Sequence, residues 1–412
     1  MIRLKKDDGS DFPEIKHIPF GEILTEYTDK TKEENEDVLL SSAIEGMFLN
    51  SELFSHQRGS SNIGYKKVKK EMLILSTQNL HLGNANVNMK YDHGIVSPAY
   101  KVYEIHDCLP QYLAYWVKLD KTKDFFLNAT TPGASACRRN VDWNALYLQK
   151  IAIPDIEEQQ KIIDFLSNID DVITESEKEV AALEEQKKGA LQKIFSQEVR
   201  FKADDGSDYP EWKSATFGDV FAMLQNNSFS RDQLSEDLGQ IQNIHYGDVL
   251  VKFGSIIDCE NDALPFINED ISTDKFNDES YIQNGDIIVA DTAEDYTAGK
   301  VAEVQNVGER KILSGLHTML CRPQKKFAPC YLGHYLNSEQ FHKQIVRLLV
   351  GTKVYSINKK VIVDTVLNYP CLEEQKKIAD FLSDFDTVID LAKQELEQWK
   401  ELKKGLLQQL FE

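Results

Sequence analysis

Two groups of residues in the second half of the chain have the types and spacing that metal-dependent chemistry requires. Asp291 is followed at some distance by Glu309, Arg310 and Lys311, and a metal nuclease uses two carboxylates to hold Mg²⁺ and a lysine to orient water. The Glu-x-Lys pattern is common, however, and it recurs twice in segments of this chain with helical periodicity. We therefore favour phosphate contacts for Arg310 and Lys311 over catalysis, with a single-chain nuclease as an alternative.

The second group, His317, Cys321, Cys330 and His334, has a spacing compatible with a zinc site. The surrounding string SGLHTMLCRP alternates like a strand, so residues three or four apart do not share a face. The six cysteines are scattered and form no C-x-x-C pair. We expect reduced core thiols, no metal and no catalytic residues.

Nucleotide-binding motifs are also missing from the sequence. The chain has no G-x-x-x-x-G-K-[ST] phosphate cradle and no G-x-G-x-x-G turn. It has no Pro-Pro dipeptide, which the polar-Pro-Pro-aromatic motif of an adenine methyltransferase would need. These observations favour a binding protein with no cofactor of its own.

The charge distribution indicates what is bound. The net charge is −20, which argues against a protein that coats nucleic acid over its whole surface. Yet residues 58–150 carry thirteen basic and seven acidic residues, and residues 310–360 carry ten basic residues and one acid. Two basic segments in an acidic chain indicate two local anion-binding faces, with an unevenly charged solvated surface as the alternative.

The candidate DNA contacts lie beside small residues that allow a close backbone approach. One cluster flanks a Gly-Ser-Ser-Asn string, a second follows Thr131-Pro132-Gly133, and a third begins at Gly351. The distance from Gly351 to Pro370 matches the distance from Gly133 to Pro154 to within two residues. An arginine in such a loop can grip a guanine edge bidentately. The candidates are Arg58, Lys66, Lys67, Lys69, Lys70, Arg138, Arg139, Arg310, Lys311, Lys353, Tyr355, Lys359 and Lys360.

Length and composition describe an ordinary globular protein. The 412 residues are 42% hydrophobic and 28% charged, which predicts two to three domains. No apolar run approaches the ~20 residues that span a bilayer. The first residues resemble no secretory signal, so we expect a cytoplasmic location.

The chain contains an internal duplication. Residues 3–23 match residues 200–220, and residues 151–195 match residues 367–411 without a gap, with 21 of 45 positions identical. The intervening blocks align poorly. We interpret the chain as one plan used twice, in which a shared framework carries two different binding blocks.

The second repeat predicts two long helices. Each begins after a proline, and Asp155 with Glu158 resembles a capping box at the first start. Apolar residues then recur at alternating steps of four and three, the heptad pattern of a coiled coil, which a lysine interrupts at the same place in both copies. Two amphipathic helices that pack separately on their own domains are the alternative. The seam residues are Ile162, Leu166, Ile169, Ile173, Leu183 and Lys187 in the first helix, and Ile378, Leu382, Phe385, Ile389, Leu396, Trp399 and Lys403 in the second.

The fold that we expect is α+β. Two globular mixed α/β domains are separated by two long helices that form an antiparallel coiled coil, with a pseudo-two-fold relation within one chain. The expected boundaries are residues 1–153 for the first domain, 154–198 for the first helix, 199–369 for the second domain and 370–412 for the second helix. Helices of ~40 residues are ~60 Å long, so the pair would act as a ruler between two half-sites.

At this point the sequence resembles the specificity subunit of type I restriction–modification enzymes. The resemblance rests on the string P-x-x-EEQ-x-K-I-x-DFLS, on the closing KKG-x-L-Q-x-x-F in both helices, and on GIVSPAY at residues 94–100. It implies target-recognition domains that each read one part of a bipartite double-stranded DNA target. It also implies a subunit without catalysis, which holds two methyltransferase subunits and two restriction or motor subunits. S-adenosylmethionine, ATP and Mg²⁺ would belong to those partners. The alternative of another class is a structural coiled-coil scaffold with protein-binding ends.

Overall fold

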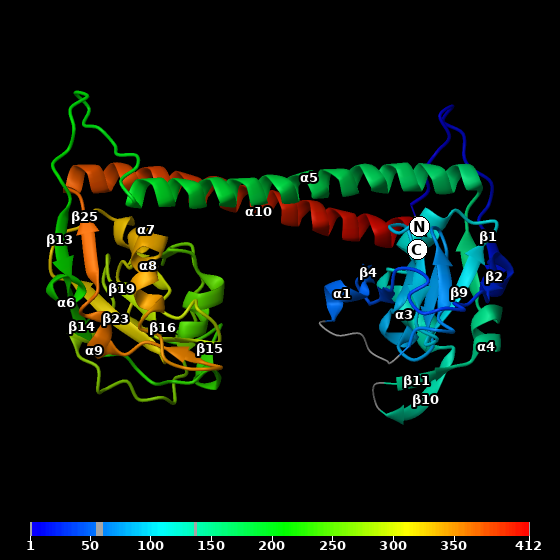
Figure 1. The fold of residues 1–412 in the computed structure, drawn as a ribbon, viewed down its shortest axis with the longest axis horizontal. Helices are drawn as coiled ribbons and strands as arrows, with labels where there is room; N and C mark the ends of the chain where they lie inside the picture. Colours follow the sequence, from blue (N-terminus) through cyan, green and yellow to red (C-terminus); the bar gives the residue numbers. More distant parts are fainter. Residues whose placement is uncertain (1, 55–60, 136–137, 412) are drawn as a thin grey trace. The chain divides into compact units, whose positions relative to one another are not determined.

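The computed structural model describes residues 2–54, 61–135 and 138–411. It divides into two compact units. The first unit contains residues 1–177 and 394–412, and the second contains residues 178–393. Each unit therefore combines one globular block with a part of both long helices, α5 (Ile156–Phe195) and α10 (Leu372–Phe411) (Figure 1).

The first unit is built around an antiparallel sheet with the strand order β2-β9-β6-β7. Alternating buried residues on β6 and β9 face a core that includes Phe20, Trp116 and Phe126, and helices α2 and α3 contribute to this core. The strands are β1 (Lys16–Pro19), β2 (Leu24–Tyr27), β3 (Leu40–Ser42), β4 (Met47–Leu49), β5 (Lys66–Lys69), β6 (Leu73–Ser76), β7 (Ala85–Val87), β8 (His93–Val96), β9 (Tyr100–Ile105), β10 (Thr130–Ser135), β11 (Arg138–Val141) and β12 (Lys150–Ile153). The short helices are η1 (Phe20–Ile23), α1 (Asn50–Leu53), η2 (Leu80–Leu82), α2 (Pro110–Trp116), α3 (Asp120–Leu127) and α4 (Trp143–Leu148).

The second unit has a five-stranded sheet, β14-β23-β19-β21-β17, and a four-stranded sheet, β15-β18-β16-β22. The strands are β13 (Lys213–Thr216), β14 (Phe221–Leu224), β15 (Leu234–Ser235), β16 (Gln242–Ile244), β17 (Ile256–Asp258), β18 (Phe266–Ile267), β19 (Ile287–Ala290), β20 (Thr292–Ala293), β21 (Val301–Gln305), β22 (Ile312–Ser314), β23 (Thr318–Pro323), β24 (Tyr355–Ser356) and β25 (Val366–Tyr369). The short helices are α6 (Phe217–Val220), η3 (Arg231–Gln233), η4 (Asp248–Lys252), η5 (Asp278–Ser280), α7 (Tyr331–Leu336), α8 (Glu339–Val346) and α9 (Lys359–Ile362). One of these short helices, η4, is a π-helix.

The two units share a framework that the sequence alignment does not reveal. The strand order β2-β9-β6-β7 corresponds to β14-β23-β19-β21, and β1 pairs with β12 as β13 pairs with β25. Helix α2 follows β9 as α7 follows β23. The string Pro-x-Tyr-Leu occurs in both places, beginning at Pro110 and at Pro329. The expected α+β architecture of two mixed domains and two long helices is confirmed, and the divergent blocks have a common central sheet.

The repeated EEQ string has a structural role at the start of each long helix. Glu158 is buried and forms a two-pronged ion pair with Arg3, and Glu374 does the same with Arg200. The following glutamine, Gln159, accepts a hydrogen bond from a backbone N–H of the globular block and donates to Pro154, an arrangement that Gln375 repeats. A buried carboxylate is tolerated when a guanidinium meets it in this geometry. The segments that contain Arg3 and Arg200 are therefore repeated together with the starts of α5 and α10, because the arginine of each segment pairs with the glutamate of its helix.

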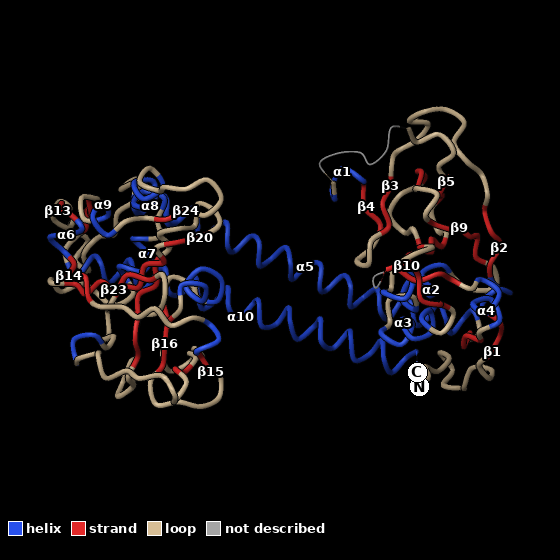
Figure 2. Tube along the Cα trace, turned by 90° about the horizontal axis from the view of Figure 1, so that it is seen from below, coloured by secondary structure: helices blue, strands red, loops and turns tan. Residues whose placement is uncertain are grey.

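Within each unit the two long helices pack antiparallel. In the first unit Asp170 pairs with Lys403 and Glu177 with Lys400, so rising residue numbers on one helix meet falling numbers on the other. In the second unit Lys187 pairs with Asp386 in the same way. Figure 2 shows both helices as continuous coils. The antiparallel coiled coil is confirmed, in contrast to helices that pack only on their own domains.

Candidate nucleic-acid interface

The lysines of β5 are largely held by carboxylates of their own unit. Lys67 pairs with Glu36 at 2.5 Å, and this contact raises the pKa of Lys67. Lys66 lies 3.9 Å from Glu26, and burial lowers the pKa of Lys66. Only the end of the strand offers exposed basic side chains, at Lys69 and Lys70. Arg58, the other predicted contact of this cluster, lies outside the described residues.

A second basic element of the first unit is the hairpin β10–β11. Gly133 is required there, because a Cβ at this position would lie 2.4 Å from the carbonyl oxygen of Arg138. Arg138 is exposed. The guanidinium of Arg139 instead donates to Thr130, with Nε 2.7 Å from Oγ1. Arg138 is thus presented to solvent, whereas Arg139 also stabilises the hairpin.

The second unit has a similar turn at the equivalent place. Gly351 adopts φ +143°, and a Cβ there would lie 1.8 Å from the carbonyl oxygen of Val354. Val350 and Ser356 exchange backbone hydrogen bonds across the turn. Strand β24 then pairs with β20, as Figure 2 shows. Lys353 and Lys360 are exposed, and Lys359 begins α9.

This turn carries an aromatic contact that sequence reasoning missed. The ring of Tyr355, a predicted DNA contact, packs at a tilt against that of Tyr296, with centroids 4.7 Å apart. Tyr296 is 59% exposed, and Val350 and Val354 of the Gly351 turn are 73% and 52% exposed. No spacing rule relates Tyr296 to Tyr355, because the β20–β24 pairing brings together two loops that are far apart in the sequence.

The remaining predicted contacts, Arg310 and Lys311, lie just before a strand of a different sheet. Arg310 donates to the carbonyl oxygen of Val307 at 3.4 Å, and the ammonium of Lys311 lies 5.5 Å from the ring centre of Tyr281. Both side chains are exposed. They precede β22, whereas the Gly351 turn is tied to β20.

The structure gives no support to metal chemistry in the part of the chain that it describes. No group of three or more histidine, cysteine, aspartate or glutamate residues among the described ranges could hold a metal ion. Asp291 Oδ1 faces His317 at 3.3 Å. Cys321 is fully buried, and burial raises the pKa of its thiol to about 12.

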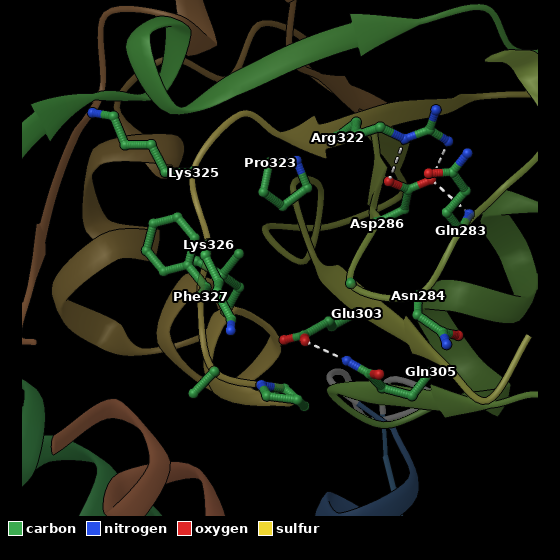
Figure 3. A pocket seen from close by; sticks show the side chains of 14 residues that line it. Gln283, Asn284, Asp286, Glu303, Gln305, Arg322, Pro323, Lys325, Lys326 and Phe327 are labelled. Carbon is green, nitrogen blue, oxygen red and sulfur yellow. Dashed lines mark hydrogen bonds and ion pairs between the residues drawn. The ribbon is translucent and has the colours of Figure 1, made fainter. Parts of the chain in front are cut away.

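A cavity of about 310 Å³ in the second unit is lined by both acidic and basic side chains (Figure 3). Asp286 forms a bidentate ion pair with Arg322. Glu303 accepts backbone N–H groups from Cys330 and Gly333, and burial raises the pKa of its carboxyl group to about 7. Glu303 thereby holds the start of α7 against β21, and Asp286 holds Arg322 of β23, so we assign both acids a structural role.

The predicted seam residues of the two helices are all buried or half-buried. The lysines that interrupt the seam have specific partners, because Lys187 pairs with Asp386 and Lys403 with Asp170. Lys403 lies 216 residues after Lys187, and Asp386 lies 216 residues after Asp170. The same polar contact is thus made once in each unit.

The outer faces of the long helices also carry a repeated feature. Phe165 and Val172 of α5 are 40% and 38% exposed, and Phe381 and Val388 of α10 are 38% and 48% exposed. The spacing of seven residues places each phenylalanine and valine on one face of its helix. The same two exposed apolar residues therefore occur in both copies, although the globular blocks differ.

Comparison with known proteins assigns the class. The model of the type I restriction modification DNA specificity domain matches residues 20–185 and again residues 210–401. The chain belongs to this family, and it is a specificity subunit whose duplicated DNA-recognition domains fit a target in two parts.

The relatives agree with this assignment. The chain is 27% identical to the type I restriction enzyme MjaVIII specificity subunit of Methanocaldococcus jannaschii, over 73% of this chain and 69% of that protein. It is 24% identical to the putative MjaX specificity subunit of the same organism, over 73% and 67%.

Solved structures show the same fold. A chain from a type I restriction–modification system, solved to explain complex assembly and conformational transition, has a TM-score of 0.58 at 16% identity, covering 97% of this chain and 98% of that one. The S subunit from M. genitalium has a TM-score of 0.53 at 12% identity, covering 100% and 99%. No helix in the described ranges is both long and apolar enough to cross a membrane.

Proposed function

We propose that this specificity subunit reads double-stranded DNA with one globular block per half-site, and that each block does so around its glycine-turn hairpin. The observation that carries the proposal is the recurrence of this turn, at Gly133 and at Gly351, with exposed basic side chains in two otherwise divergent blocks. Phosphate contacts position a reader without reading sequence. Lys69, Lys70 and Arg138 suit this role in the first unit.

In the second unit Lys353, Lys359 and Lys360 suit phosphate contacts beside Tyr355, and Arg310 and Lys311 supply a further basic patch. The acidic remainder of the chain would disfavour DNA on other surfaces, since the net charge is −20. Lys66 and Lys67 contribute less in this proposal, because carboxylates of the first unit already pair with them, and Arg139 contributes less because its guanidinium already donates to Thr130.

Catalysis would be the work of partner subunits. We assign no catalytic residue to this chain. Two methyltransferase subunits would bring S-adenosylmethionine, and two restriction or motor subunits would bring ATP and Mg²⁺. The assembly would act in the cytoplasm, where the DNA is.

The methyltransferase subunits would dock on the outer faces of α5 and α10. The paired residues Phe165 with Val172 and Phe381 with Val388 form an exposed apolar strip on each helix. The strips are the same in both copies while the DNA-reading blocks differ, so they suit a partner that is present twice.

Copurification and footprinting test this function. The chain is expressed with the methyltransferase subunit of its own system, and the purified assembly is footprinted on DNA that carries its methylated motif. We expect two protected segments separated by an unprotected spacer. A single continuous footprint, or protection that does not depend on the motif, would contradict reading in two parts.

A further inference from the structure

The two units share a short backbone arrangement beside the glycine-turn hairpins, at which their side chains differ. In the first unit the N–H of Thr77, just after β6, donates to the carbonyl oxygen of Ala99, just before β9, at 2.9 Å. In the second unit the N–H of Asp291, just after β19, donates to the carbonyl oxygen of His317, just before β23, at 3.0 Å. The strand pairings place Ser76 opposite Tyr100 and Ala290 opposite Thr318, so the positions are equivalent.

The exposure of the two positions is also equivalent. Ala99 and His317 are exposed, and Thr77 and Asp291 are half-buried. Each arrangement is joined to the hairpin of its unit, because Arg139 N–H donates to Gln78 and Ile357 N–H donates to Asp291. The two units thus have the same backbone arrangement with different side chains beside a proposed DNA contact. Two domains that recognise different base sequences require such an arrangement.

His317 has a further mark of a functional position. Its φ is +53°, in the left-handed region that a residue other than glycine rarely adopts. The turn is held by Thr318, whose hydroxyl donates to Gly315 at 2.6 Å, and by Tyr246, whose N–H donates to Leu316. Backbone strain that surrounding contacts hold in place is characteristic of functional sites, where a side chain must keep a defined orientation.

The contacts of His317 define the chemistry of this position. Asp291 Oδ1 lies 3.3 Å and Thr292 Oγ1 lies 3.4 Å from His317 Nδ1. The ring of Tyr246 packs edge-on against the imidazole, with centroids 5.3 Å apart. The carboxylate of Asp291 can only accept hydrogen bonds, and the imidazole tautomer that carries its proton on Nδ1, toward Asp291, has an acceptor at Nε2. The carboxylate would repel a phosphate, whereas acceptors match the exocyclic amines that adenine N6 and cytosine N4 present in the major groove.

We propose that Asp291 and His317 form a base-reading position of the second unit, which accepts a hydrogen bond from the exocyclic amine of adenine or cytosine in the second half-site. Thr77 and Ala99 occupy the corresponding position in the first unit. The inference rests on the proposed function and adds to it the residues and the kind of base edge that are read.

Methylation of defined duplexes by the assembled methyltransferase tests the inference. The wild-type assembly is first assayed on duplexes with each base pair of both half-sites changed in turn. In the Asp291→Asn variant the acceptor-only carboxylate becomes an amide of the same shape. We expect its preference at one base pair of the second half-site to fall about tenfold or more, since a good base contact discriminates to that degree. All preferences in the first half-site should stay unchanged.

Two further variants separate reading from folding. His317→Asn keeps a residue that tolerates the left-handed backbone, and we expect it to alter preference at the same or the adjacent base pair. Asp37→Asn changes a similar carboxylate in the first unit, 2.7 Å from His93 Nδ1, and it should leave the second half-site unaffected. Thermal unfolding of each free chain checks that the fold is intact.

The outcomes are distinguishable. Folded Asp291→Asn and His317→Asn variants that keep every wild-type preference in the second half-site would overturn the base-reading position and leave the proposed function standing. A wild-type assembly whose preferences do not fall into two separate groups of base pairs would overturn the proposed function itself.

Discussion

At the scale of single residues, each lysine on the helix seam is matched by an aspartate of the other helix. The side chain of Lys187 is 14% exposed and that of Asp386 is 37% exposed, so the pair is partly withdrawn from water. A polar residue on a coiled-coil seam lowers stability but fixes register when it finds its partner. The equivalent pair Lys403–Asp170 repeats the contact in the first unit.

A charge reversal tests the contact between Lys187 and Asp386. Lys187→Asp places two carboxylates together, and we expect the free energy of unfolding to fall by about 1 kcal/mol or more. The double variant with Asp386→Lys should recover most of this loss. Urea denaturation of the free chain measures both. Lys188→Asp, at a neighbouring side chain that is 76% exposed, is the control and should change stability by less than about 0.5 kcal/mol. Equal losses in the single and double variants would contradict a specific pair.

The buried His334, beside the Lys187–Asp386 pair of the second unit, predicts a folding stability that depends on pH. Burial, together with the nearby Lys187 and against the opposing effect of Asp386, lowers the pKa of His334 to about 4. The unfolded chain binds a proton on this histidine near its ordinary pKa of 6.5, whereas the folded chain stays neutral to about pH 4. Its contribution to stability is therefore complete above pH 6.5 and is lost as the pH falls from 6.5 to 4, by up to about 3 kcal/mol.

The matched variant for this prediction is His334→Tyr, because Tyr115 occupies the equivalent place in α2 and donates to Asp170 at 2.8 Å. The difference in unfolding free energy between wild type and variant, measured by urea titration at pH 7 and pH 4.5, isolates the histidine from other titrating groups. We expect the variant to lose less stability on acidification. A difference that does not change with pH would contradict the assignment.

Sequence reasoning at this scale identified residue types better than their partners. The seam lysines were visible from the heptad pattern, but Asp386 and Asp170 were not, because pairing depends on the register of the other helix. Asp155 does cap the first helix, through the N–H of Glu157, yet the predicted return contact of Glu158 is wrong because that carboxylate pairs with Arg3. The sequence shows that a lysine is present and does not show whether its charge is already paired.

At the scale of elements, the ends of the long helices belong to the cores of the globular blocks. Phe411 of α10 is 2% exposed and its ring packs at a tilt against Tyr112 in the first unit, with centroids 4.8 Å apart. Phe195 of α5 packs edge-on against Tyr331 and Tyr335 in the second unit. The repeated closing phenylalanine is thus an anchor that joins a helix to a block.

Removing this anchor should be costly. Phe411→Ala leaves a cavity in a packed core, and we expect the free energy of unfolding to fall by about 3–5 kcal/mol. Leu402→Ala, on a side chain that is 47% exposed, is the control and should change stability little. Calorimetry and denaturant titration of the free chain measure the effect. A Phe411→Ala chain as stable as the Leu402→Ala chain would show that the anchor contributes nothing.

The exposed strips on the helices predict a defect in assembly rather than in folding. Phe381→Ser should leave the free chain folded, since the side chain is 38% exposed, and should weaken binding of methyltransferase subunits. Phe165→Ser together with Phe381→Ser should weaken it further. Leu391→Ser is the control, because this exposed residue corresponds to Glu175 in the other copy and is not repeated. Analytical ultracentrifugation with the methyltransferase subunit distinguishes these outcomes, and normal assembly of the double variant would place docking elsewhere.

The long helices could be predicted from the sequence, and the strand arrangement could not. Heptad spacing and gapless identity define 40-residue helices, which the structure places at Ile156–Phe195 and Leu372–Phe411. The central sheets consist of short strands whose neighbours are far apart in sequence, such as β2 beside β9 and β14 beside β23. Their shared order therefore emerged only from the hydrogen-bond register.

At the scale of the whole molecule, two units repeat one framework with different blocks, and recognition should be separable in the same way. Exchanging residues 24–150 for the corresponding block of another specificity subunit should change one half of the methylated motif and leave the other half unchanged. Sequencing of methylated bases in cells that carry the exchanged gene measures this. The domain boundaries predicted from the sequence stay predictions until such exchanges succeed. Changes in both halves of the motif would show that the blocks do not read independently.

The core of the first unit includes Leu410 and Phe411, and the N–H of Ile2 donates to the carbonyl oxygen of Gln409. A ribosome makes the other parts of this core first and these residues last. The newly made first block must therefore wait, with apolar surface uncovered, until the second block has been made and translation has reached Leu410 and Phe411. A message broken or stopped early would yield a product whose first block never closes, which marks such fragments for chaperones and proteases.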